Sequence, residues 1–145
     1  MKRRVSAAVV ALIGAATLTV AAVAAVAPGT YKGSLHQANG TKIANAPATI
    51  SVVGTKVTIK APRLPVKGLS PSGTYTVPRA PIPYEFKGTL KGNTVSGNYA
   101  PPLGGTGEYF VAKGTFFPAT KTFVGKLSVV TRGYQGTSTV RAKKA

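Results

Sequence analysis

The sequence lacks cysteine, tryptophan and aspartate, and it holds only one histidine and two acidic residues, Glu85 and Glu108. Without cysteine there is no disulfide, no thiolate metal site and no lipid-anchored cysteine. General acid–base catalysis needs positioned titratable groups, usually His, Asp or Glu. The sequence therefore argues against an enzyme, and we predict no catalytic residue, no metal site and no cofactor.

The few titratable groups that are present do not form a catalytic pattern. His36 begins a turn-like segment, residues 36–41, where we expect it to be solvated. Glu85 alternates with Tyr84 and Phe86, which places its carboxylate on the outward face of a strand. A pair of carboxylates for glycoside hydrolysis would have to combine Glu85 with Glu108, and nothing in the spacing favours that.

The first 25 residues resemble a secretory signal peptide. A basic head, Met1-Lys2-Arg3-Arg4, precedes residues 5–27, which contain no charge and no proline and end in small residues. This order predicts cleavage after Ala24 or Ala25, and hence a secreted, periplasmic or cell-surface protein. The alternative is an N-terminal membrane anchor, because about 20 apolar residues can span a bilayer. Cleavage is favoured because the alanine-rich second half is only weakly apolar.

Positive charge dominates the rest of the chain. Three of the 19 basic residues lie in the leader, which leaves 16 against two acidic residues in residues 26–145. Such a surface attracts anionic envelope polymers or lipid headgroups. The alternative is that the charge only keeps the protein soluble. A nucleic-acid partner is disfavoured, because export removes the usual cytoplasmic partners and the aromatic residues share strand faces with Leu and Val.

Residues 26–145 have the pattern of one β domain with about eight short strands. In residues 49–60, apolar and polar residues alternate on both sides of Gly54, which is typical of an antiparallel hairpin. Three further segments read aromatic–x–Gly–x–Leu: residues 31–35, 86–90 and 123–127. Because side chains alternate along a strand, the aromatic, glycine and leucine residues share the inward face.

The same alternation assigns candidate binding residues. Lys32, Lys87 and Lys126 fall on the outward face and are the predicted basic contacts. The predicted interior residues are Tyr31, Phe86, Phe110 and Phe123. The inward glycines would leave room beside these rings, which could hold a small apolar ligand.

Residues 61–83 are predicted to be a proline-rich loop. Six prolines fall there: Pro62, Pro65, Pro71, Pro78, Pro81 and Pro83. Proline cannot donate the hydrogen bond that a central strand requires. We therefore expect a loop with at most an edge strand, covering one side of the domain.

An all-β fold with eight antiparallel strands can close into a small barrel. A two-sheet β-sandwich is the alternative, and the alternation does not separate the two. The expected function is an exported, non-catalytic binding module for an anionic surface polymer or a small apolar ligand. The alternative function is a structural or interaction protein of the cell envelope with no small ligand.

Overall fold

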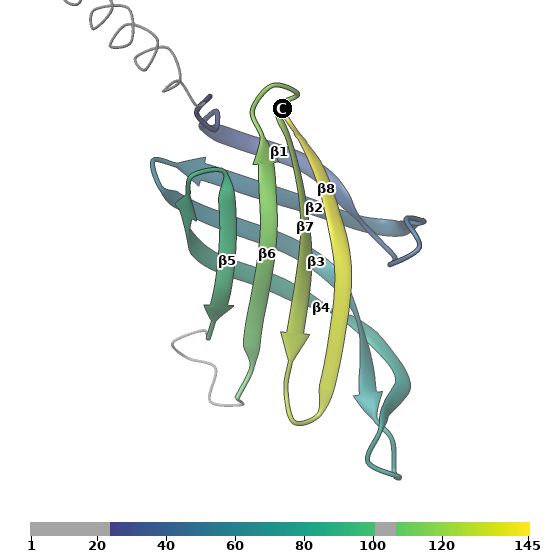
Figure 1. Ribbon diagram of the computed structural model, residues 1–145. Coiled ribbons are helices and arrows are strands. Elements are labelled where there is room, and N and C mark those ends of the chain that lie inside the picture. The colour runs from purple at the N-terminus through teal and green to yellow at the C-terminus, as the bar shows by residue number, and fades with distance from the viewer. Residues whose placement is uncertain (1–23, 101–106) are drawn as a thin grey trace, which may run out of the picture.

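The computed structural model describes residues 24–100 and 107–145, and all regular structure within them is β-strand. The strands are β1 (Gly29–His36), β2 (Lys42–Val53), β3 (Lys56–Leu69), β4 (Tyr75–Lys91), β5 (Thr94–Tyr99), β6 (Tyr109–Phe117), β7 (Thr122–Val130) and β8 (Tyr134–Lys144). Each pairs antiparallel with the next, and β8 pairs with β1 (Figure 1). The predicted eight-stranded barrel is confirmed, because this ring leaves no separate sheets for a sandwich.

The predicted leader, residues 1–25, lies almost wholly outside the described residues. Among the residues that are described, none forms a helix long and apolar enough to cross a bilayer.

Side-chain alternation decides what each strand places inside the barrel. Along β7, Phe123, Gly125 and Leu127 are buried, whereas Val124 and Lys126 are exposed. The four predicted interior residues are all buried, with exposed fractions of 1% for Tyr31, 1% for Phe86, 5% for Phe110 and 0% for Phe123. The side chains at the inward positions of the strands therefore form one continuous hydrophobic core.

The inward glycines provide space that aromatic rings occupy. The Phe123 ring lies between Gly114 of β6 and Gly125 of β7, and a Cβ added at Gly125 would lie 2.8 Å from the ring. An added Cβ at Gly114 would meet the same ring even more closely. At Gly88 an added Cβ would lie 2.5 Å from the Phe86 ring. These glycines are thus needed because the rings already fill the space beside them.

The rings also pack against one another across the interior. The centroids of Tyr31 and Phe116 are 5.2 Å apart, and those of Phe116 and Phe123 are 4.6 Å apart. Phe110 meets Tyr84 edge to face at 5.0 Å. Such contacts add about 0.5–1.5 kcal/mol each beyond the area they bury.

Around the barrel, the shortest strand pairing is between β4 and β5, which pair only at Leu90 with Val95 and at Lys91 with Thr94. The side chain of Tyr84 on β4 adds a contact with β6. Its hydroxyl donates a hydrogen bond of 2.8 Å to the carbonyl oxygen of Val111 in β6. Burial raises the pKa of Tyr84 above its usual value, which keeps this donor protonated.

Residues 61–83 form most of a hairpin arm, so the prediction of a loop there was wrong. β3 continues to Leu69, a turn follows at residues 70–74, and β4 returns from Tyr75. In Figure 1 the two strands extend past the end of the barrel as a twisted ribbon. The β3 prolines coincide with register shifts between Ala61 and Val66. The β4 prolines lie where that strand pairs only with β3 among the described residues, and proline is tolerated on such edge segments.

The arm is fixed to the barrel by contacts with β8 and the turn before it. Lys67 and Gly68 of β3 pair with Gln135 and Tyr134 of β8. The Arg79 guanidinium lies 5.0 Å from the centroid of the Tyr134 ring, and the Tyr134 hydroxyl donates to Glu108. Burial, and then the bond to Glu108, raise the pKa of Tyr134 to about 12, against a smaller lowering by Arg79. These contacts therefore attach the arm to the rest of the domain.

Candidate anion-binding surface

The outward residues of five adjacent strands, β6, β7, β8, β1 and β2, line up in rows across the sheet. One row runs Lys113, Lys126, Thr139, His36 and Lys42. The next runs Thr115, Val124, Arg141, Ser34 and Pro47, and a third runs Phe117, Thr122, Lys143, Lys32 and Thr49. Neighbouring strands are roughly 4.8 Å apart, so the rows cover roughly 19 Å.

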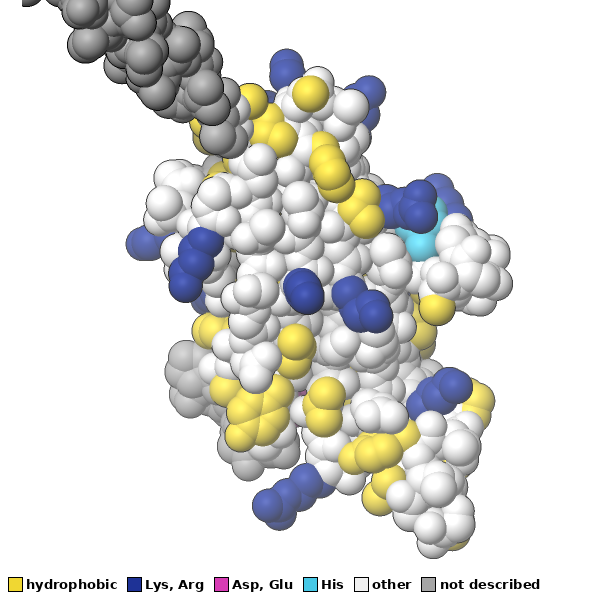
Figure 2. All heavy atoms as spheres, viewed as in Figure 1, with side chains coloured by type: hydrophobic (Ala, Val, Ile, Leu, Met, Phe, Trp, Pro, Cys, Tyr) yellow, Lys and Arg dark blue, Asp and Glu magenta, His cyan; other side chains and the backbone are white. Residues whose placement is uncertain are grey.

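These three rows concentrate positive charge without any acidic residue. We call them the basic face, and their exposed cations are Lys32, Lys42, Lys113, Lys126, Arg141 and Lys143. Figure 2 shows basic side chains spread over the wall formed by β6, β7 and β8, with almost no acidic side chain in view. Glu85 lies on β4, opposite Lys60, and Glu108 precedes β6 and accepts the Tyr134 hydroxyl.

Two cross-strand pairs on the basic face place like charges directly opposite each other. Lys113 of β6 is the register partner of Lys126 of β7, and Lys32 of β1 is the partner of Lys143 of β8. Opposed like charges destabilise a sheet, by an amount on the order of 0.2–1 kcal/mol per pair. A bound anion that contacts both members of a pair would remove that repulsion.

A hollow of about 380 Å³ lies at one end of the basic face. Lys32, Arg141 and Lys143 supply three cations around it, and Thr122 and Val124 line the side formed by β7. Three positive side chains and one hydroxyl around a shallow surface suit a phosphate, sulfate or carboxylate group. We call this depression the basic hollow.

The structure brings two of the three predicted lysines together. Lys32 and Lys126 both lie on the basic face, but Lys87 does not. Lys87 is on β4, with its Nζ 3.7 Å from Glu85 Oε1 and 6.0 Å from the centroid of the Tyr99 ring. Its charge is thus partly compensated within the protein.

Sequence reasoning missed four cations of the basic face, namely Lys42, Lys113, Arg141 and Lys143. Alternation within residues 108–117 already places Lys113 outward. The sequence predicts a last strand over residues 137–141, so Lys143 falls outside it, whereas β8 continues to Lys144. Which outward residues are neighbours depends on strand register, and a single sequence does not supply that.

His36 has a structural position at the edge of this face. Its Nδ1 lies 3.1 Å from the Gly40 carbonyl oxygen, and its Nε2 lies 3.2 Å from Ser34 Oγ. The ring thereby helps to hold the turn between β1 and β2. Within residues 24–100 and 107–145, no three potential metal ligands of the His, Cys, Asp or Glu type come together.

The cations of the basic face are exposed, whereas the predicted interior residues are buried. No protein-family model matches the chain, and neither a curated protein nor a solved structure is significantly similar to it.

Proposed function

We propose that the protein is an exported, non-catalytic binding module that holds an anionic polymer of the cell envelope on the basic face. The observation that carries this proposal is the pair of like-charge cross-strand contacts, Lys113 with Lys126 and Lys32 with Lys143, on a face without acidic residues. A polymer whose negative charges repeat along its length would neutralise both pairs at once.

Several simultaneous contacts are needed, because each exposed ion pair contributes only about 0–1 kcal/mol. Once the first anionic unit of a polymer is bound, its neighbours meet the remaining cations at high effective concentration. Six cations over roughly 19 Å of sheet suit such a ligand better than a single small ion.

The interior supports a role for the surface in preference to carriage of a small apolar ligand. The rings of Phe86 and Phe123 occupy the space beside Gly88, Gly114 and Gly125. Tyr31 and Phe110 are buried against Phe116 and Tyr84. The sequence of the leader supports export, which would place the basic face among envelope polymers.

The test is binding of heparin and of long-chain polyphosphate at several salt concentrations, using two variants of equal net charge. The face variant carries Lys32→Gln, Lys126→Gln, Arg141→Gln and Lys143→Gln. The control variant carries Lys56→Gln, Lys60→Gln, Arg63→Gln and Lys91→Gln, which are exposed residues of β3 and β4. Both remove three lysines and one arginine.

We expect the face variant to lose about tenfold or more in affinity, equivalent to 1.4 kcal/mol, and the control variant to lose much less. The face variant should also show a weaker dependence on salt, because fewer screened contacts remain. Equal losses in both variants, or no binding by the wild-type protein at low salt, would overturn the proposal.

A further inference from the structure

A second depression lies at the other end of β8, where the β3–β4 arm leaves the barrel. This groove has a volume of about 560 Å³, within the range of small-molecule sites. Its hydrogen-bonding side chains are those of Lys67, Arg79, Gln135 and Thr137, and its apolar walls are Pro65, Val66 and Pro78. None of the residues that line it is acidic.

The groove exists because β8 changes partners along its length. Tyr134 and Gln135 pair with β3, and pairing with β1 starts at Thr139. Residues 136–138 lie between these two contacts. Gly136 allows the β3 backbone to approach, since a Cβ at this position would collide with the Pro65 carbonyl oxygen. The contact between Arg79 and Tyr134 holds the arm in place, so the groove is formed before any ligand arrives.

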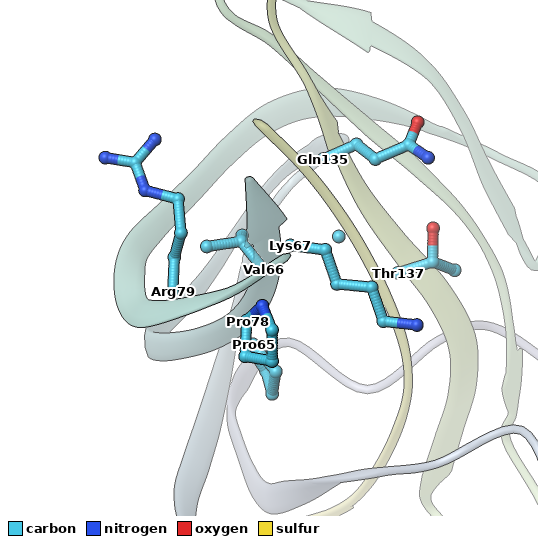
Figure 3. A pocket seen from close by; sticks show the side chains of 8 residues that line it. Pro65, Val66, Lys67, Pro78, Arg79, Gln135 and Thr137 are labelled. Carbon is cyan, nitrogen blue, oxygen red and sulfur yellow. The ribbon is translucent and has the colours of Figure 1, made fainter. Parts of the chain in front are cut away.

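Most of the polar groups converge on one side of the groove. In Figure 3 the side chains of Lys67, Gln135 and Thr137 lie on one side of the groove, and Arg79, which also lines it, lies on the other side. A ligand there would meet two basic residues, one amide and one hydroxyl beside proline rings. A sugar ring with a carboxylate or sulfate matches this combination, because it has a charge, hydroxyl groups and an apolar ring face. Polyphosphate offers no apolar face to the prolines.

β8 connects the groove to the basic face. Its outward residues, in order, are Gln135, Thr137, Thr139, Arg141 and Lys143. At about 3.4 Å per residue, the distance from Gln135 to Lys143 is about 27 Å. A chain molecule lying along β8 would therefore contact the groove at one end and the basic hollow at the other.

We infer that the bound polymer is an acidic polysaccharide that lies along β8, with one acidic sugar residue in the groove and the following residues over the basic face. This inference rests on the proposed function and adds the class of polymer to it. The groove selects sugar over other polyanions, and the basic face supplies most of the charge attraction.

The test compares hyaluronan oligosaccharides of increasing length with long-chain polyphosphate. The groove variant is Lys67→Met with Gln135→Leu, which keeps side-chain volume but removes the polar ends. The matched control is Lys60→Met with Gln37→Leu, at exposed positions outside the groove. Thermal melts of all proteins establish that each variant is folded.

We expect the groove variant to bind the oligosaccharides about tenfold more weakly than the control, with polyphosphate affinity equal in the two variants. Wild-type affinity should rise with oligosaccharide length and level off once the chain reaches both ends of the roughly 27 Å track. Polyphosphate binding without oligosaccharide binding, or equal oligosaccharide affinity in the two variants, would overturn the sugar inference and leave the proposed function intact. Failure to bind either polymer would overturn both.

Discussion

The inward and outward side chains of β7 differ in their neighbours: the inward ones are closely packed, whereas the outward lysine has no neighbour of opposite charge. On the inward face, Phe123 fills the space left by Gly114 and Gly125, and Leu127 is fully buried. On the outward face, Lys126 lies opposite Lys113 with no acid in its row. The interior side chains thus match one another in shape, whereas the cations of the basic face have no acidic counterpart in its three rows.

The two walls of the barrel differ in the same way. On β3 and β4, Lys60 lies opposite Glu85, which is also within 3.7 Å of Lys87. Other cations of β3 and β4, such as Lys56 and Lys91, face neutral residues. On β6, β7, β8 and β1 there is no acidic residue, and two pairs of cations lie directly opposite each other. Because both walls are antiparallel sheet, the difference between them lies in side-chain charge, and the proposed binding surface is the wall without an acidic residue.

The largest expected effect comes from disturbing the interior. Gly114→Ala should lower the free energy of unfolding by about 1–3 kcal/mol, because the new methyl group must displace the buried Phe123 ring. Adding Phe123→Leu should recover part of this loss by removing ring atoms. Urea denaturation measures both variants. A Gly114→Ala variant as stable as the wild type would show that the ring does not need this space.

A smaller effect on stability is expected at Tyr84, near the short pairing between β4 and β5. Tyr84→Phe should cost about 1 kcal/mol, because the Val111 carbonyl loses its hydrogen-bond donor. Burial raises the pKa of Tyr84 in the folded state, so the folded protein keeps a proton that the unfolded chain loses above about pH 10. The stability that this tyrosine contributes is complete below about pH 10 and is lost as the pH rises further.

The stability difference between the wild type and Tyr84→Phe should therefore shrink above about pH 10. Denaturation curves at pH 8 and at increasingly alkaline pH measure this difference. A constant difference in the free energy of unfolding between the two proteins over that range would contradict a raised pKa for Tyr84.

The smallest effect on stability is expected on the basic face, and its sign is opposite. Lys126→Glu should raise the free energy of unfolding by a few tenths of a kcal/mol, because an attractive pair with Lys113 replaces a repulsive one. The same change should weaken heparin binding. Lys87→Glu is the matched control, since it makes the same charge change beside Glu85 and should not stabilise. Equal stability changes in the two variants would contradict the difference in charge pairing between Lys126 and Lys87.

Period-two alternation was enough to predict the all-β class, the outward positions of Lys32 and Lys126, and the buried positions of Tyr31, Phe86, Phe110 and Phe123. It did not separate a barrel from a sandwich, because closure depends on the pairing of β8 with β1. It could not predict the basic face as a unit, because the partners of Lys113 and Lys32 are set by register between strands. The arm was missed for another reason. Because proline has no backbone N–H, it disrupts a ladder only at positions where an N–H must donate a hydrogen bond. The sequence does not show which strand edges are unpaired.

Binding of an anionic polymer to the basic face can be tested by two-dimensional NMR, in which amide chemical shifts are mapped while a heparin oligosaccharide is titrated into the protein. We predict that shifts concentrate on the strands of the basic face, at Lys32, Lys113, Lys126, Arg141 and Lys143. Amides of Lys56 and Lys91, on β3 and β4, should change little. Shifts centred on those two residues, or on the buried residues Phe86 and Phe123, would contradict the assignment of the basic face as the binding surface.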